Sequence, residues 1–156
     1  MSKIGVIRIR GELNVKREIK DTMNMLRLFN KNYCVVIDNN DNYVGMIKKI
    51  KDYVTWGEIN KETFESLLKN RGRLAGNKRL TEDYLKEKLK ISSKEFTEEF
   101  FNNKKSMKEI PGLKLFFRLH PPVKGFERGG IKKVFSLGGV LGYRKDKIND
   151  LIQRMI

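Results

Sequence analysis

Two segments of the chain combine glycine with basic side chains, and this combination suits the binding of phosphate groups. The longer segment runs from Arg118 to Lys145 and the shorter one from Arg71 to Arg79. Glycine lets backbone amides approach a phosphate because it carries no Cβ, and an arginine guanidinium donates two N–H groups at once to phosphate oxygens. Folded RNA offers irregular backbone turns that such loops can follow. The pattern therefore predicts an RNA-binding surface, with the longer segment laid on the RNA as an extended arm.

The same residues have a plainer interpretation, in which the glycines serve turns and the cations serve solubility. That interpretation suits any single residue but is weak for two such loops in one chain. The run from Gly138 to Gly142 lacks the Gly-Lys-Ser/Thr ending of a P-loop, so no nucleotide site is predicted there. Phe126 and Phe135 are open to two interpretations, as core residues or as residues that stack on bases.

Residues that bind metals or act as nucleophiles are scarce. His120 is the single histidine and Cys34 the single cysteine, so neither a metal site nor a cofactor is predicted. Cys34 lies in the apolar run from Tyr33 to Ile37, where a small buried thiol is expected, and one cysteine excludes an intramolecular disulfide. We expect His120 to stack on a base, to contact a phosphate or to end a strand before the two prolines that follow it.

Paired carboxylates are the remaining candidates for catalysis. Glu82-Asp83 and Glu98-Glu99 both fall in the early turns of expected helices, where acidic side chains interact favourably with the helix dipole. This placement explains both pairs, and no catalytic residue is predicted. An RNA-processing enzyme stays open as an alternative if Glu98, Glu99 and His120 share a pocket.

The charge of the chain is large and unevenly distributed. Lys and Arg number 34 against 19 Asp and Glu, which gives a formal net charge of +15. Residues 104–145 hold eleven basic and two acidic residues, so more than half of the excess lies in about a quarter of the chain. Such a charge repels itself unless a polyanion neutralises it, and nucleic acid is therefore the expected partner.

The sequence shows neither a membrane span nor a signal peptide. Its apolar runs are all much shorter than a helix that crosses a membrane requires. The segment 1–8 includes no hydrophobic region of a signal peptide. Together with the lone cysteine, these features predict a soluble protein of the cytoplasm. We expect neither a membrane nor a small-molecule substrate among its partners.

The segment 1–60 alternates between strand and helix patterns. Asn14 is the expected N-cap of the first helix. The order βαβαβ predicts a small α+β core of ferredoxin-like type, with a three-stranded sheet and both helices on one face. The expected elements are strands at 4–10, 33–38 and 52–57 and helices at 15–29 and 43–51.

Residues 61–156 are predicted to form a helical and basic RNA-binding extension packed on the core of residues 1–60. Thr81 begins a segment that has the acidic first turn of a capped helix, and Ser93 begins another. The expected elements are helices at 63–70, 81–89, 93–101 and 146–155 and a strand at 113–119.

Motifs along nearly the whole chain resemble one protein family. The run from Arg118 to Pro122, Arg-Leu-His-Pro-Pro, is similar to the archaeal type of the large-subunit ribosomal protein L-thirty family. The segments 128–133 and 138–155 resemble the end of its eukaryotic counterpart, L-seven, almost position for position. The basic residues of 69–72 and 77–79 fit the middle loop of the family, and the segment 1–60 resembles the short bacterial member.

Two departures refine this resemblance. The chain lacks the long lysine-rich N-terminal tail of the eukaryotic form, which favours an archaeal source. Val44 stands where many bacterial members have arginine, which argues against an RNA contact at that position.

The resemblance implies a non-catalytic, structural constituent of the large ribosomal subunit that binds and stabilises ribosomal RNA during assembly and translation. Its implied partners are large-subunit ribosomal RNA and neighbouring large-subunit ribosomal proteins, in cytoplasmic ribosomes. A free RNA- or DNA-binding regulatory protein or chaperone is the alternative function.

The residues expected to bind RNA lie in the two glycine-rich loops, at the first strand–helix junction and at the end of the second expected helix. They are Arg8, Arg10, Lys16, Arg17, Lys48, Lys49, Arg71, Arg73, Lys78, Arg79, Arg118, His120, Lys124, Arg128, Lys132, Lys133, Arg144 and Lys145.

Overall fold

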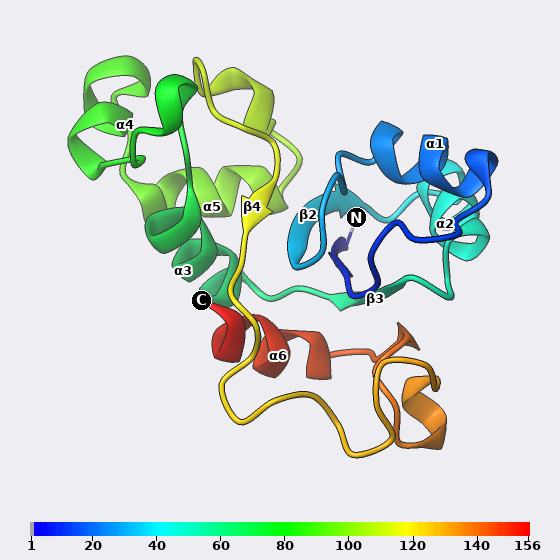
Figure 1. The fold of residues 1–156 in the computed structure, drawn as a ribbon. Coiled ribbons are helices and arrows are strands. Elements are labelled where there is room, and N and C mark those ends of the chain that lie inside the picture. The colour runs from blue at the N-terminus through cyan, green and yellow to red at the C-terminus, as the bar shows by residue number, and fades with distance from the viewer. Residues whose placement is uncertain (1) are drawn as a thin grey trace.

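Three antiparallel strands form the centre of the fold, namely β1 (Lys3–Arg8), β2 (Tyr33–Asp38) and β3 (Val54–Glu58). The computed structural model describes residues 2–156, and β1 lies between the other two strands (Figure 1). These runs are rich in β-branched and aromatic side chains, which suit a pleated and buried surface. The βαβαβ order expected for the segment 1–60 is confirmed.

Two short strands extend this sheet at its edges. β4 (Phe117–Arg118) pairs antiparallel with β2, and β5 (Gly142–Tyr143) pairs parallel with β3. The sheet therefore has five strands in the order β4-β2-β1-β3-β5, which corrects the expected three-stranded sheet. The strand expected at 113–119 shrinks to the pair Phe117–Arg118. Strands this short leave no alternating pattern in a sequence, because they form only where tertiary packing brings them beside a longer strand.

Helices α1 (Arg17–Met25) and α2 (Asp41–Lys49) cover one face of the sheet. Side chains alternate along β1, so Val6 points to this face and packs in one cluster with Met23 and Ile47. Burying an aliphatic side chain of this size stabilises the fold by roughly 1.5–3 kcal/mol. The expectation that both helices lie on one face is confirmed.

The starts of these two helices differ from the sequence expectation. Asn14 does not cap α1: its φ is 53°, and the residue before the helix is Lys16, whose side chain forms no cap. Asparagine tolerates the left-handed backbone region, so it forms a turn here instead. α2 begins at Asp41, ahead of the expected position 43, because the Asn40 side chain accepts a hydrogen bond from the Tyr43 amide.

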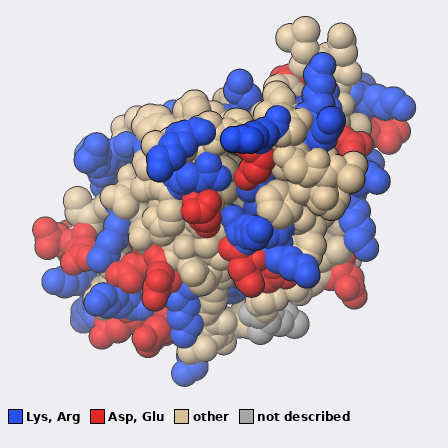
Figure 2. Space-filling view, turned by 90° about the horizontal axis from the view of Figure 1, so that it is seen from below, with Lys and Arg blue, Asp and Glu red and all other residues tan. Residues whose placement is uncertain are grey.

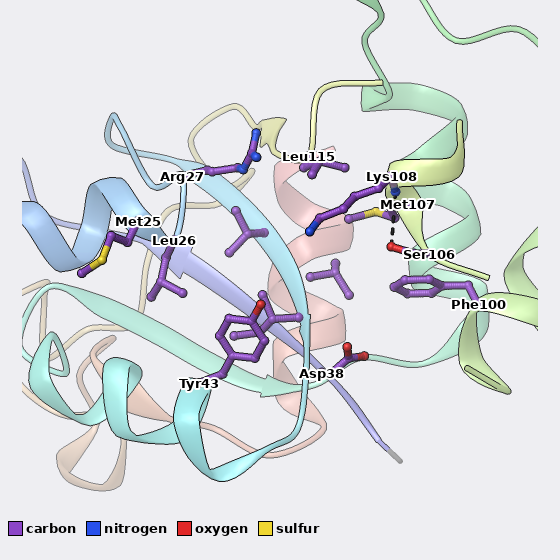
Figure 3. Close-up of a pocket in the computed structure, with 13 residues that line it drawn as sticks. Met25, Leu26, Arg27, Asp38, Tyr43, Phe100, Ser106, Met107, Lys108 and Leu115 are labelled. Atoms are coloured by element: carbon purple, nitrogen blue, oxygen red, sulfur yellow. Dashed lines mark hydrogen bonds between the residues drawn. The ribbon is translucent and has the colours of Figure 1, made fainter. Parts of the chain in front are cut away.

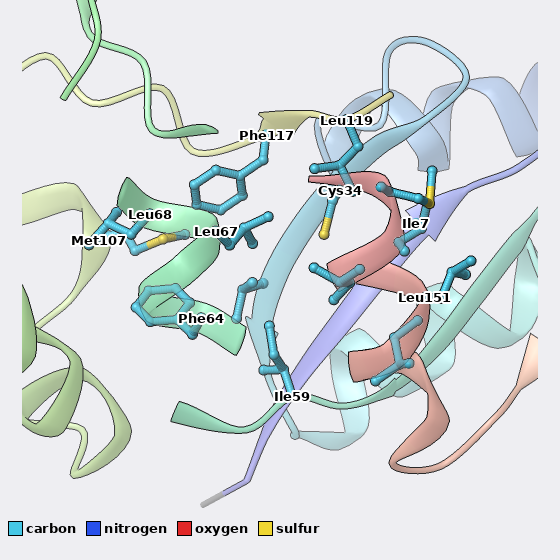
Figure 4. Packing of buried hydrophobic residues seen from close by; sticks show 14 of the residues in the cluster. Ile7, Cys34, Ile59, Phe64, Leu67, Leu68, Met107, Phe117, Leu119 and Leu151 are labelled. Carbon is cyan, nitrogen blue, oxygen red and sulfur yellow. The ribbon is translucent and has the colours of Figure 1, made fainter. Parts of the chain in front are cut away.

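The opposite face of the sheet is covered by helices from the rest of the chain. Ile7 of β1 belongs there to the larger hydrophobic cluster, which also contains Phe64 of α3 and Leu151 of α6 (Figure 4). The segment 61–156 thus shares a core with the segment 1–60. The helices are α3 (Lys61–Arg71), α5 (Ser93–Phe101) and α6 (Lys147–Met155), with α4 (Glu82–Leu89) further from the sheet (Figure 1).

Side-chain caps define where two of these helices begin. The Thr81 hydroxyl accepts a hydrogen bond from the Tyr84 amide at the start of α4. Ser92 and Glu95 form a reciprocal capping box at the start of α5, so the cap lies just before the expected Ser93. Helices expected from their acidic first turns therefore occur where the sequence places them.

Cys34 is fully buried in the larger cluster, which confirms the expectation of a buried thiol. Burial raises the pKa of Cys34 to about 12, because the charged thiolate is poorly solvated there. Among residues 2–156, no helix combines the length and the apolar character that crossing a bilayer requires.

Candidate nucleic-acid interface

Most of the residues expected to bind RNA lie exposed on the surface. Arg10, Arg71 and Arg73 are half-buried, and Arg8 and Arg144 are buried. Figure 2 shows the face that carries α6: basic side chains are spread across it, and acidic ones are densest at its lower left. The exposed members are Lys16, Arg17, Lys48, Lys49, Lys78, Arg79, Arg118, His120, Lys124, Arg128, Lys132, Lys133 and Lys145.

Arg8 serves the fold, and its place in the expected RNA interface is corrected. Its guanidinium is fully buried and donates hydrogen bonds to the carbonyl oxygens of Leu28 and Phe29, each over 2.7 Å. These carbonyls follow α1, where the chain turns back toward the sheet. Burial lowers the pKa of Arg8, and the charge of Glu12 acts in the opposite direction. The side chain joins β1 to the end of the first helical segment and is closed to RNA.

Arg144 is the second correction, since it is only 2% exposed. Its guanidinium donates to Thr55 Oγ1, Glu127 Oε1 and the carbonyl oxygen of Val140, each over 2.9 Å. The ring centroid of Phe135 lies 4.7 Å from the guanidinium carbon, so this aromatic ring packs on the buried cation. Arg144 therefore braces the loop that precedes it against β3.

One group of expected cations lies around α1 and α2. We call Arg10, Lys16, Arg17, Lys48 and Lys49 the N-terminal patch. The guanidinium carbon of Arg10 lies 5.1 Å from the ring centroid of Tyr53. Lys49 Nζ forms an ion pair with Glu18 Oε2 over 3.6 Å. The ion pair shows that residues from the two helices meet on this surface, and that part of its charge is already neutralised.

A second group converges on a pocket of about 370 Å³, which we call the arginine pocket. Arg71, Arg73 and Arg79 line it together with His120, which comes from a distant part of the chain. Burial lowers the pKa of Arg71, and the positive charges of Arg73 and Arg79 lower it further. The pocket thus brings arginines of the segment 71–79 together with His120, which lies near the beginning of the segment 118–145. The complete lining is Lys69, Asn70, Arg71, Arg73, Arg79, His120 and Ile156.

The third group lies on residues 119–141, which we call the C-terminal loop. The loop is fastened to α6: the His120 amide donates to the Met155 carbonyl over 3.0 Å, and the Val123 amide donates to the Arg154 carbonyl over 2.8 Å. The expectation of an extended arm is therefore corrected to a loop folded against the final helix.

Glycines tighten the C-terminal loop on itself. A Cβ at Gly139 would lie 2.2 Å from the carbonyl oxygen of Lys133, so only glycine fits this close approach. The amide of Gly129 donates to the carbonyl oxygen of Gly138 over 2.9 Å. Backbone contacts thus hold the exposed Arg128 and Lys132 on a folded surface, so binding of a ligand there would cost little backbone freedom.

A cation–aromatic cluster at the edge of the sheet was not expected from the sequence. The rings of Tyr33 and Phe116 stack with centroids 5.1 Å apart, and the Arg118 guanidinium lies 5.7 Å from the first ring and 5.9 Å from the second. Phe29, 39% exposed, packs edge-on against Phe116. Such a surface suits stacking on unpaired bases. Alternation along 113–119 would have placed Phe116 and Arg118 on one face, which is the signal that could have revealed it.

A further pocket of about 300 Å³ lies outside the predicted sites, beside β2 (Figure 3). Leu26 and Tyr43 lie on one side of it, and Phe100 and Met107 on the other. None of the residues expected to bind RNA lines it. This pocket is therefore separate from the residues predicted to bind RNA.

The three residues that would favour an RNA-processing enzyme lie in different surroundings. His120 lines the arginine pocket, Glu99 forms an ion pair with Lys105 over 2.8 Å, and Glu98 is exposed on α5. Their arrangement does not provide the acid–base pair that such an enzyme requires.

Comparison with known proteins identifies one family. The family described as ribosomal protein L30p/L7e matches residues 4–54. Among curated relatives named large ribosomal subunit protein uL30, the one from Methanococcus vannielii is 56% identical over 151 residues, covering 97% of both chains. The relative from Methanopyrus kandleri is 51% identical over 149 residues, which are 95% of this chain and 100% of that protein. The relative from Nanoarchaeum equitans is 47% identical over the full length of both chains.

Proposed function

Because the chain belongs to the ribosomal protein L30p/L7e family, we propose that it is a structural constituent of the large ribosomal subunit that binds and stabilises ribosomal RNA. The observation that carries this proposal is the identity of 47–56% over nearly the whole chain with proteins named large ribosomal subunit protein uL30. This membership confirms the resemblance noted from the sequence motifs.

The distribution of charge supports RNA as the ligand. The N-terminal patch, the arginine pocket and the C-terminal loop present cations from separate parts of the chain on the surface of one fold. Each cation that meets a phosphate releases condensed counterions, and this release favours binding to a polyanion. The buried Arg8 and Arg144 contribute indirectly, because they hold in place the backbone that carries the exposed cations.

We further propose that the protein has no catalytic role, and that it acts in cytoplasmic ribosomes among large-subunit ribosomal RNA and neighbouring large-subunit proteins. The same proposal assigns residues 1–60 to an L-thirty-like core and residues 61–156 to an RNA-binding extension packed on it. Support for this division comes from α3 and α6, which cover the face of the sheet that α1 and α2 leave free.

Co-sedimentation tests the proposed function. The chain is given an affinity tag and expressed in cells of an organism that carries a relative of this protein. The lysate is then centrifuged through a density gradient at moderate salt. We expect the protein to migrate with the large subunit, and to move to the top when the subunit is dissociated by removing magnesium and adding salt. Recovery only in light fractions with free RNA or DNA would instead support a regulatory protein or chaperone.

A further inference from the structure

We propose that the arginine pocket is a clamp for a single backbone phosphate of ribosomal RNA, held by Arg71, Arg73 and Arg79. The identity of the polyanion rests on the proposed function, whereas the anion site rests on the geometry of the pocket. Its volume of about 370 Å³ is larger than one phosphate group, which leaves room for the sugar attached to it.

Arg73 and Arg79 lie directly opposite each other in a small antiparallel hairpin. Because backbone hydrogen bonds lie on both sides of this pair rather than within it, the two residues form the non-hydrogen-bonded type of pair, in which side chains come closest. Like charges directly opposite each other destabilise such a pair. An anion between them removes this repulsion. The flanking hydrogen bonds run from Leu74 N to Lys78 O over 2.8 Å and from Leu80 N to Gly72 O over 3.0 Å.

The backbone of the hairpin is held on both sides. Its first strand continues directly from α3, where the Gly72 amide donates to the Leu68 carbonyl oxygen over 3.0 Å. The carbonyl oxygen of Arg73 accepts a hydrogen bond from the Lys114 amide over 2.8 Å, which holds the backbone from the other side. The turn is the short 3-10 helix η1 (Ala75–Asn77). The backbone thus holds Arg73 and Arg79 opposite each other, and both side chains line the same pocket.

Arg71 adds a third guanidinium, and part of it has no partner. One Nη donates to the main-chain oxygen of Ile156, but Nε is buried without an acceptor. A buried donor without an acceptor costs stability, and a phosphate oxygen in the pocket would supply the acceptor. Here the protein leaves a hydrogen-bonding group that a ligand can satisfy.

Within the described part of the chain, no carboxylate side chain pairs with the three arginines, and the main-chain oxygen of Ile156 is the one protein acceptor that Arg71 is shown to contact. Lys69, at the rim of the pocket, pairs with Glu65 over 3.0 Å and with Glu82 over 3.1 Å. Among the ion pairs between side chains of residues 2–156, none includes Arg71, Arg73 or Arg79. Arginine forks match the oxygens of a phosphate in geometry as well as in charge. The combination of a fixed backbone, a buried donor without a partner and three arginines that no side-chain carboxylate of the described residues neutralises therefore fits an RNA phosphate.

Titration with inorganic phosphate tests the anion site on the free protein. The readouts are the melting temperature and the NMR signal of the Arg71 Nε–H group, with chloride at equal ionic strength as the reference. We expect a saturable shift in the wild type that is absent in Arg73→Ala/Arg79→Ala. The matched control, Lys86→Ala/Lys94→Ala, removes the same charge from exposed positions of α4 and α5 and should respond as the wild type does. No response in the wild type, or an equal response in the pocket variant, would overturn the anion site.

Binding to large-subunit ribosomal RNA tests whether the anion is an RNA phosphate. The variant Arg73→Lys/Arg79→Lys keeps both charges and loses the guanidinium forks, so we expect roughly tenfold weaker binding at moderate salt with an unchanged salt slope. The matched control Lys86→Arg/Lys94→Arg changes two exposed lysines of α4 and α5 that lie outside the expected interface, and it should bind as the wild type does. Wild-type affinity in the pocket variant would overturn the RNA clamp and leave the proposed function intact. Failure of the wild type to bind this RNA would contradict the proposed function itself.

Discussion

Arg144 Nη1 lies 2.9 Å from Glu127 Oε1, and this ion pair joins the C-terminal loop to the residue that directly follows β5. The same guanidinium donates to Thr55 Oγ1 of β3 over 2.9 Å. The next residue, Lys145, is exposed. Two adjacent cations in one basic run therefore have different roles, one inside the fold and one on the surface available to RNA.

Replacing Arg144 should destabilise the fold. Arg144→Ala removes the ion pair with Glu127 and leaves a buried hydroxyl and a buried carbonyl without their donor, so we expect the free energy of unfolding to fall by roughly 2–4 kcal/mol. Urea unfolding measures this change. The control Lys145→Ala alters an exposed neighbour and should change stability by less than about 0.5 kcal/mol. Equal stability of the two variants would contradict the structural role of Arg144.

Glycine at position 57 is required by a close backbone contact. A Cβ at Gly57 would lie 2.0 Å from the Lys145 carbonyl oxygen, so Gly57→Ala must push α6 away from β3. We expect a loss of roughly 1–3 kcal/mol in the free energy of unfolding, measured by urea denaturation. Gly45→Ala is the matched control, because nothing lies within 4 Å of a Cβ there and the residue is inside α2. It should leave stability unchanged or raise it by roughly 0.5–1 kcal/mol.

The exposed cations of the C-terminal loop should contribute to RNA binding through charge. The triple change of Arg128, Lys132 and Lys133 to alanine removes three exposed cations while the brace at Arg144 remains. If all three meet phosphates, the slope of log affinity for ribosomal RNA against log salt should decrease by about 3 × 0.7–0.9. Filter binding at several salt concentrations measures the slope, and an unchanged melting temperature controls for folding. A slope equal to that of the wild type would remove these residues from the interface.

The Glu127 carboxylate should make stability depend on pH in acid. Its burial raises the pKa of Glu127, but the hydrogen bond and charge of Arg144 outweigh burial, so the pKa lies below its ordinary value of 4.5. The charged form is therefore favoured by folding. Its stabilising contribution is fully present above the ordinary pKa and is lost as the pH falls through the lower pKa of the folded state.

The variant Glu127→Gln tests this dependence. We expect the wild type to be more stable than the variant near neutral pH, and the difference to shrink as the pH falls below about 4. Urea unfolding of both proteins at a series of pH values measures the difference. A difference that stays constant into the acid range would show that the charge of Glu127 is not the source of the stabilisation.

Local patterns predicted most of the helices and central strands. The helix at 93–101 is found at Ser93–Phe101, because acidic first turns and helical spacing of apolar residues act within a few residues of each other. The turn at Asn14 was misjudged, since asparagine suits both an N-cap and a left-handed turn and the sequence does not distinguish them. The edge strand β4 was expected as part of a longer strand at 113–119, and β5 was not expected, because each exists only beside its partner in the sheet.

The sequence by itself determined the family, the positive charge and the two glycine-rich basic loops, since these depend on residue types and on their order. Only the tertiary structure decided which cations face solvent. Arg8 and Arg144 are buried because their partners, the carbonyl oxygen of Leu28 and the carboxylate of Glu127, are brought to them by distant parts of the chain. The same long-range packing set His120 beside the arginines of residues 71–79, and no local pattern contains that contact.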